Sequence, residues 1–334
     1  MMDAVLGAAA GLPRARLAAY LLFAAIAVAA VALGTGPLLL AGLFSYMILD
    51  LTDRWLAPRL PEGMSRWLAL GIFLVTAAGL SWLFGLFIKQ TLARTPEILN
   101  SVLPQVETLA KRLGVELPFE DMRGMREAVA AFLMDNVRIV TTVSGRMSKV
   151  VLLVLAGIVI AVLRFMAGAE PCAASDPYEE LCREFNARAR LYMSGFEKIL
   201  GAQVIIALIN TVLTLIFLSA VGMPYIPFLA LATFVFGILP IIGNLISNTI
   251  IVGTALTISP HLALMTLTFL VVIHKGEYFL NSRIVGGSLR TPMWQTLIAI
   301  VLGELIMGVA GVILAPTVLY YVREEIRSTR ADRA

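Results

Sequence analysis

Long apolar segments separated by short polar connections dominate this sequence. Eight such segments lie at residues 17–33, 36–51, 67–88, 150–163, 199–221, 225–258, 262–280 and 293–322. A helix that crosses a bilayer needs about 20 predominantly apolar residues, and it satisfies its backbone polar groups internally. The pattern therefore predicts an all-α polytopic membrane protein.

The sixth and eighth segments are too long for one ordinary crossing, and each contains helix-disrupting residues near its middle. The sixth includes Pro240 and Gly243, and the eighth includes Gly308 and Gly311. A continuous helix of about 33 residues would be about 50 Å long, against a hydrocarbon core of about 30 Å. Non-helical backbone at membrane depth is tolerated only where protein buries it or where it lines an aqueous cavity. Paired breaks are typical of transporters, although one long tilted helix for each segment is the simpler alternative.

Arg and Lys residues gather in alternate short connections. With the N-terminus in the cytoplasm, the inner connections carry these cations, and the outer turns at 34–36, 222–224 and 259–261 carry none. Cytoplasmic loops are enriched in Lys and Arg, so both termini are expected in the cytoplasm. This orientation requires each long segment to enter and leave on one side. The predicted fold has about six full spans plus two opposed re-entrant helical hairpins, with tips near residues 240–244 and 308–311.

Four regions follow from this topology. They are residues 1–88 with the first three transmembrane helices, 89–149 as an external amphipathic helical domain, 150–221 with transmembrane helices 4 and 5 and the cytoplasmic loop 164–198, and 222–334 with hairpin 1 (225–258), a transmembrane helix (262–280), hairpin 2 (293–322) and a cytoplasmic tail. In the external domain, Pro96, Pro104 and Pro118 predict helix breaks. Its apolar stripe favours packing or oligomerisation over substrate binding. The cytoplasmic loop predicts a mixed-charge helix that starts near Asp176.

Composition agrees with a membrane protein, since 59% of the 334 residues are hydrophobic and 14% are charged. The cytoplasmic arginines explain the formal net charge of +4, which gives no reason to expect a nucleic-acid partner. Arg14 and Arg16 precede an apolar stretch longer than that of a signal peptide, so the first span is expected to stay. Cys172 and Cys182 lie on the predicted cytoplasmic side, where thiols remain reduced, and we interpret them as structural or incidental.

Motifs of common enzymes are missing from the sequence. It has no His-Glu-x-x-His zinc motif, no Gly-x-Ser-x-Gly nucleophile turn and no phosphate-binding loop. Two histidines are present, and His261, which follows Pro260, is typical of a surface turn. We therefore expect neither an enzyme nor a resident metal or cofactor, and H+ or Na+ would act only as a coupling ion.

Polar side chains near the two breaks are the candidates for substrate or ion binding. Glu304 precedes the second break, and an isolated carboxylate at membrane depth has to be paired, hydrated or protonated. It either couples transport to protons or stays neutral and hydrogen-bonds the nearby backbone break. Asn244 and Asn248 follow the first break, where the free N–H groups of a helix N-terminus favour polar or anionic ligand atoms. Helix capping is the alternative, above all for Asn244.

A second polar cluster ends the helix between the two long segments, and we expect it to serve coupling or gating. Its members are His274, Glu277, Asn281 and Arg283. His274 and Glu277 are three residues apart, so they share a helix face and are expected to pair or to relay a proton. Arg283 alternatively extends to the inner membrane interface. Gln203 and Asn210, seven residues apart on one face of the fifth span, are interpreted as contacts between helices.

The order of these residues resembles a known family. The chain contains Pro240-x-x-Gly243, then Glu277-x-x-x-Asn281-x-Arg283-x-x-Gly286, then Gly308-x-x-Gly311 followed by Pro316. This order is similar to the C-terminal half of the autoinducer-2 exporter family of bacterial membrane proteins, and the overall plan matches along the chain. The chain departs from the family at His274, where Gln is common, and at Ser282, where Pro is common. These departures bear on the substrate more than on the architecture.

The resemblance implies a secondary transporter in the bacterial cytoplasmic (inner) membrane that assembles as a homo-oligomer, a pentamer. It implies a scaffold part and a mobile part that bears two opposed hairpins and works by an elevator-like movement. Members of the family are associated with export of the autoinducer-2 signal, and others with exchange of sodium or lithium for protons. Fold similarity alone assigns neither substrate to this chain.

The leading hypothesis is a proton-coupled exporter of a small polar solute, with its site between the two tips. Asn244, Asn248, Glu304 and the backbone freed at both breaks would bind the solute, and Glu304 or Glu277 would carry the proton. A Na+(Li+)/H+ antiporter is the alternative within transport. A non-transporting envelope scaffold is the alternative from another class, and two facing broken segments argue against it.

Overall fold

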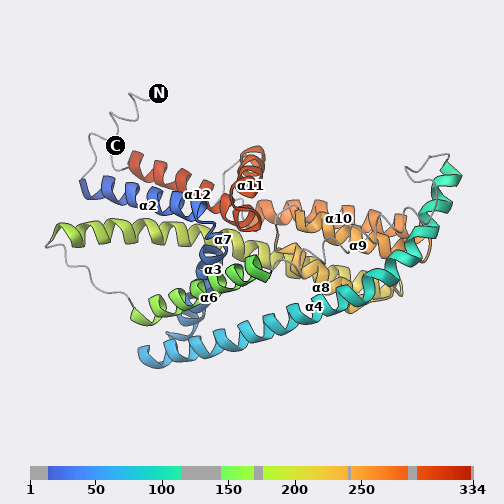
Figure 1. Cartoon of the computed structure of the whole chain (residues 1–334), viewed down its shortest axis with the longest axis horizontal. Helices are drawn as coiled ribbons and strands as arrows, with labels where there is room; N and C mark the ends of the chain where they lie inside the picture. The colour runs from blue at the N-terminus through green and yellow to red at the C-terminus, as the bar shows by residue number, and fades with distance from the viewer. Residues whose placement is uncertain (1–13, 114–143, 169–175, 240–241, 285–291, 332–334) are drawn as a thin grey trace. The chain divides into compact units, whose positions relative to one another are not determined.

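The computed structural model describes residues 14–113, 144–168, 176–239, 242–284 and 292–331, and its regular elements there are all helices (Figure 1). In chain order they are α2 (Arg14–Ala32), α3 (Gly36–Leu56), α4 (Glu62–Leu113), α6 (Ser144–Ala167), α7 (Pro177–Ala220), α8 (Ile226–Gly237), α9 (Ile242–Leu256), α10 (Pro260–Ile284), α11 (Met293–Met307) and α12 (Val309–Ala331). The prediction of an all-α protein is confirmed.

Among the described residues, five helices are long and apolar enough to cross a membrane. They are α2, α3, residues 63–86 of α4, residues 148–167 of α6, and α7. These helices contain the first five predicted spans. The sixth predicted span corresponds to α10, which has 25 residues and a polar C-terminal part. At 1.5 Å per residue α10 is long enough to cross a bilayer, but its crossing stays a prediction.

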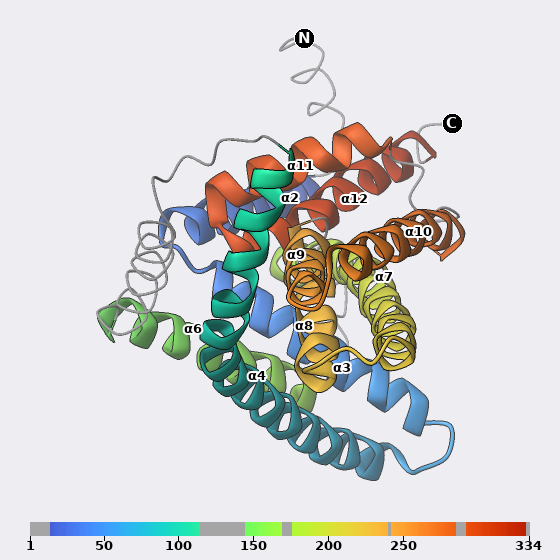
Figure 2. The same ribbon diagram turned by 90° about the vertical axis from the view of Figure 1, so that its right-hand side faces the viewer.

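Both long apolar segments are broken into two helices. In the first, α8 ends at Gly237 and α9 begins at Ile242, and the two helices pack against each other (Figure 1 and Figure 2). In the second, α11 and α12 pack against each other and are separated by Gly308 alone. Neither segment is one long tilted helix. Whether each pair re-enters the membrane from one side stays a prediction.

The second break is narrower than the sequence indicated. Gly308 has φ 60° and ψ −142°, a conformation open almost only to glycine. Gly311, which the sequence analysis placed at the tip, lies in the first turn of α12, so that placement is wrong. Its role is packing, because a Cβ at Gly311 would overlap the carbonyl oxygen of Gly303 on α11. Small residues allow two helix backbones to approach this closely.

The segment predicted to be external begins within a helix that is longer than expected. α4 is a single helix of 52 residues that continues through both Pro96 and Pro104, so the breaks predicted at these prolines are wrong. A proline inside a helix removes one backbone hydrogen bond and bends the helix, and neighbouring turns sustain it. The hydroxyl of Thr108 donates to the carbonyl oxygen of Pro104 at 2.8 Å. Pro118 lies outside the described residues, and an external location stays a prediction.

The mixed-charge helix predicted near Asp176 begins at Pro177. Proline is favoured at the first helical position, where its missing N–H is no loss. This charged stretch and the fifth predicted span form one continuous helix, α7, of 44 residues.

The chain divides into two compact units. Unit 1 comprises residues 1–74, 150–199 and 291–334, and unit 2 comprises residues 75–149 and 200–290. The pair α8 and α9 therefore belongs to unit 2, and the pair α11 and α12 belongs to unit 1.

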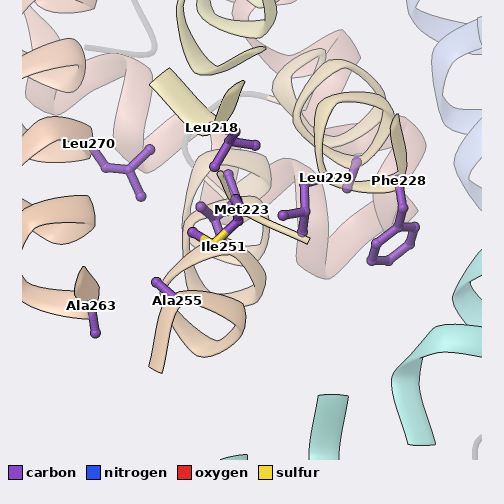
Figure 3. Close-up of a cluster of buried hydrophobic side chains, with 9 residues drawn as sticks. Leu218, Met223, Phe228, Leu229, Ile251, Ala255, Ala263 and Leu270 are labelled. Atoms are coloured by element: carbon purple, nitrogen blue, oxygen red, sulfur yellow. The ribbon is translucent and has the colours of Figure 1, made fainter. Parts of the chain in front are cut away.

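An apolar core joins the end of α7 to α8, α9 and α10 in unit 2. Figure 3 shows its side chains, which come from the end of α7, the following turn, α8, α9 and α10. The fully buried members include Leu218, Leu229 and Ile251. Beside this core, the rings of Phe217 and Phe269 stack with centroids 3.9 Å apart. The core places α8, α9 and α10 in contact, and so positions the polar residues of these helices.

We predict that Gly311→Ala destabilises unit 1, because the added methyl group forces α12 away from Gly303. Overpacking of this kind typically costs about 1–3 kcal/mol. The melting temperature of the detergent-purified protein measures the effect. Gly71→Ala on α4 is the control, since a Cβ there meets nothing within 4 Å. Equal melting temperatures for wild type and Gly311→Ala would contradict the close approach of α11 and α12.

Candidate functional site

The carboxylate of Glu277 lies at the centre of a polar cluster in unit 2. Its side chain is only 9% exposed. Its Oε2 accepts a hydrogen bond from Nδ2 of Asn244 at 2.8 Å and another from Nδ2 of Asn210 at 3.1 Å. The three residues come from α10, α9 and α7, and both asparagines are buried. A carboxylate removed from water is costly unless donors satisfy it, and the two amides supply them.

His274 borders the cluster on the same helix as Glu277. Its Nδ1 lies 3.5 Å from Oε2 of Glu277, and its side chain is 61% exposed. The predicted contact between these two residues is confirmed.

The break between α8 and α9 orients Asn244. Gly243 has no space for a side chain, because a Cβ would overlap the carbonyl oxygen of Phe236 at the end of α8. Nε2 of Gln203 donates to the carbonyl oxygen of Gly237 at 2.9 Å and so satisfies a backbone group at the end of α8. Asn244 follows within the first turn of α9 and directs its amide to Glu277. A helix cap would use the side-chain oxygen of Asn244, whereas the bond to Glu277 uses its amide nitrogen, so the capping alternative stays a prediction.

The other predicted site residues lie in several places. Asn248 is half-buried on α9, one turn after Asn244. Glu304 is exposed on α11 and belongs, with Gly308 and Gly311, to unit 1.

For three predicted site residues, the structure leaves the side chain or the whole residue outside its described part. Pro240 lies outside the described residues. Asn281 and Arg283 lie on α10, but their side chains are outside the described part. The site predicted between the two tips combines residues of both units, and it stays a prediction.

Asn210 is the residue whose role the sequence analysis missed. Its spacing of seven residues from Gln203 on α7 indicated contacts between helices, and both residues do make such contacts. The spacing gave no indication that one contact would be to Glu277. The signal that the sequence did offer was an amide side chain, that of Asn210, on the same apolar face of α7 as Gln203.

Ion pairs in unit 1 join helices to one another. Arg188 is 4% exposed, and its Nη1 bonds both the carbonyl oxygen and Oε2 of Glu184 at 2.7 Å. Its Nη2 lies 3.3 Å from Oε1 of Glu325 on α12. Arg54 bonds both oxygens of Glu197 at 2.8 Å. Paired charges that join helices in this way hold the unit together.

We predict that Asn210→Ala destabilises the protein, because Glu277 keeps only one of its two amide donors. Removing a partner from a buried polar group typically costs about 1–3 kcal/mol. Thr211→Val is the matched control on α7, since the Thr211 hydroxyl donates only within its own helix, to the carbonyl oxygen of Ala207 at 2.7 Å. Thermal unfolding monitored by tryptophan fluorescence compares the variants. If both lower the melting temperature equally, the bond to Glu277 has no special weight.

Comparison with known proteins identifies the family of the chain. No curated protein matches the chain. A family model described as "AI-2E family transporter" matches residues 17–331, nearly the whole chain. This match covers the spans, both broken segments and the cluster at Glu277. The chain therefore belongs to the AI-2E family of membrane transporters.

Proposed function

We propose that this protein is a secondary-active transporter that exports a small polar solute of the autoinducer-2 type by alternating access. The observation that supports this proposal best is the nearly buried Glu277 carboxylate with its two amide donors from separate helices. Ionisable residues inside membrane proteins most often mark substrate, ion or proton pathways. The cluster also adjoins the α8–α9 break, where transporter sites are commonly built.

The chemistry of the cluster suits a hydroxyl-rich solute. The Glu277 carboxylate is an acceptor for hydroxyl groups, and the amides of Asn244 and Asn210 offer both donors and acceptors. A proton on Glu277 removes its charge and weakens its bonds to both amides. Proton binding and solute binding at Glu277 therefore influence each other, as coupled transport requires. In this proposal His274 exchanges the proton with solvent.

The movement that we propose is elevator-like. Two compact units, each with its own broken apolar segment, fit a mechanism in which one part moves while another stays anchored in the bilayer. Assembly as a homopentamer in a bacterial inner membrane, with both termini in the cytoplasm, belongs to the same proposal. Asn248, Glu304 and the backbone at Gly308 remain candidates for solute binding.

We predict that Glu277→Gln in proteoliposomes abolishes the pH dependence of solute transport, because glutamine has the size of glutamate but does not titrate. Uptake of radiolabelled autoinducer-2 into these proteoliposomes, measured with and without a pH gradient, tests this. Glu304→Gln is the matched control for an exposed carboxylate on α11. A gradient response that survives in Glu277→Gln and is lost in Glu304→Gln would move the coupling role to Glu304.

A monovalent cation/proton antiporter is the second candidate, favoured by the carboxylate and amide oxygens of the same cluster, which suit a hard cation. We expect no cation-specific signal from the proposed exporter. Acridine-dye dequenching on addition of NaCl or LiCl, with choline chloride as the control salt, separates the two functions. Dequenching by sodium or lithium that disappears in Glu277→Gln would establish the antiporter and overturn the exporter.

A further inference from the structure

Two arginine side chains of unit 1 converge on one residue, Gly168, at the end of α6. Nη1 of Arg164 donates to the carbonyl oxygen of Gly168 at 2.7 Å. The guanidinium of Arg66, from the first turns of α4, also lies against Gly168. Its Nη1 lies 2.8 Å from the position that a Cβ on Gly168 would occupy. The left-handed φ of 72° at Gly168 turns the chain there, and the missing side chain gives Arg66 its space.

This pair of guanidinium groups lacks an anion among the residues that the structure describes. Arg54, Arg188 and Arg327 of the same unit each form an ion pair with a carboxylate. Arg66 and Arg164 form none within the described ranges. Arg164 is partly accounted for, because a cation near the C-terminal carbonyls of a helix is favourable. Arg66 has no comparable reason to lie against the same residue, where its charge repels that of Arg164.

The position of the pair along the spans indicates the level of the phospholipid headgroups. Arg66 lies near the start of the span at 63–86, and Arg164 near the end of the span at 148–167. Trp67 and Trp55 are 66% and 62% exposed, and the guanidinium of Arg59 lies 4.6 Å from the ring centroid of Trp55. Exposed tryptophans beside arginines are typical of the membrane–water interface.

We propose that Arg66 and Arg164 bind the phosphate of an anionic phospholipid. Guanidinium groups match phosphate oxygens with pairs of charge-assisted hydrogen bonds, and one phosphate between the two arginines relieves their repulsion. Basic pockets between transmembrane helices on the cytoplasmic side commonly bind acidic lipid headgroups. The site lies outside the Glu277 cluster and does not depend on the transport function.

Apolar side chains beside the arginines favour a lipid over free phosphate. Leu163, Trp67 and Leu68 are exposed next to Arg164 and Arg66 in the sequence. Acyl chains are the natural cover for such surface on a membrane span, so the phosphate and the chains of one lipid have adjacent binding surfaces. Free phosphate would use the guanidinium groups alone.

Native mass spectrometry of the delipidated full-length protein, titrated with phosphatidylglycerol, tests the proposal. A basic side chain at the membrane surface contributes about 1 kcal/mol, so Arg66→Ala and Arg164→Ala should each weaken binding about fivefold. Arg66→Lys keeps the charge without the two-pronged geometry and should give an intermediate loss. It also serves if Arg66→Ala does not fold. Arg190→Ala, which removes an exposed arginine of α7, is the matched control and should retain wild-type binding.

Two further arms decide the identity of the ligand. Phosphatidylcholine, whose headgroup has no net charge, should bind more weakly than phosphatidylglycerol and should lose less affinity on Arg66→Ala. Inorganic phosphate at millimolar concentration should not displace phosphatidylglycerol. Full displacement by inorganic phosphate would show a free-anion site and overturn the lipid assignment. Equal phosphatidylglycerol binding by wild type and all arginine variants would overturn the site itself.

Discussion

The architecture depends on one constraint, that every backbone N–H and C=O at membrane depth needs a partner inside the protein. A continuous helix satisfies these groups by its own hydrogen bonds. Each of the two broken segments leaves some backbone groups without a partner in its own helices. At the first break, Gln203 supplies a donor to Gly237. At the second, the whole interruption is reduced to Gly308, and the glycines at 303 and 311 let the two helices meet backbone to backbone. In both segments, side chains or glycines thus compensate for the interruption.

The need for an internal hydrogen-bond partner applies also to the carboxyl side chain of Glu277, near the first break. Glu277 is nearly inaccessible to water, and it is satisfied by amides from two other helices. A neutral amide donates hydrogen bonds without adding a second charge to the buried site. A lysine or arginine at position 210 or 244 would instead form a charge-assisted pair with Glu277.

Sequence reasoning was strongest where the physics is local. Apolar run length predicted the helices, and Pro240 and Gly308 predicted where two long segments would break. Local rules failed at Pro96 and Pro104, where the surrounding turns sustain the helix, and at Gly311, where packing and not turning explains the glycine. The bond between Asn210 and Glu277 joins residues 67 positions apart, so it depends on which faces of α7 and α10 meet. Periodicity placed Asn210 and Glu277 each on one face of its helix. It could not predict that these two faces would contact each other.

The two oxygens of Glu277 are not equivalent. Both asparagines donate to Oε2, which uses its two lone pairs, and Oε1 accepts no hydrogen bond from the described residues. A polar group that reached the cluster could bond Oε1 without displacing an amide. One end of the side chain thus joins three helices, and the other end offers an acceptor that those helices do not use.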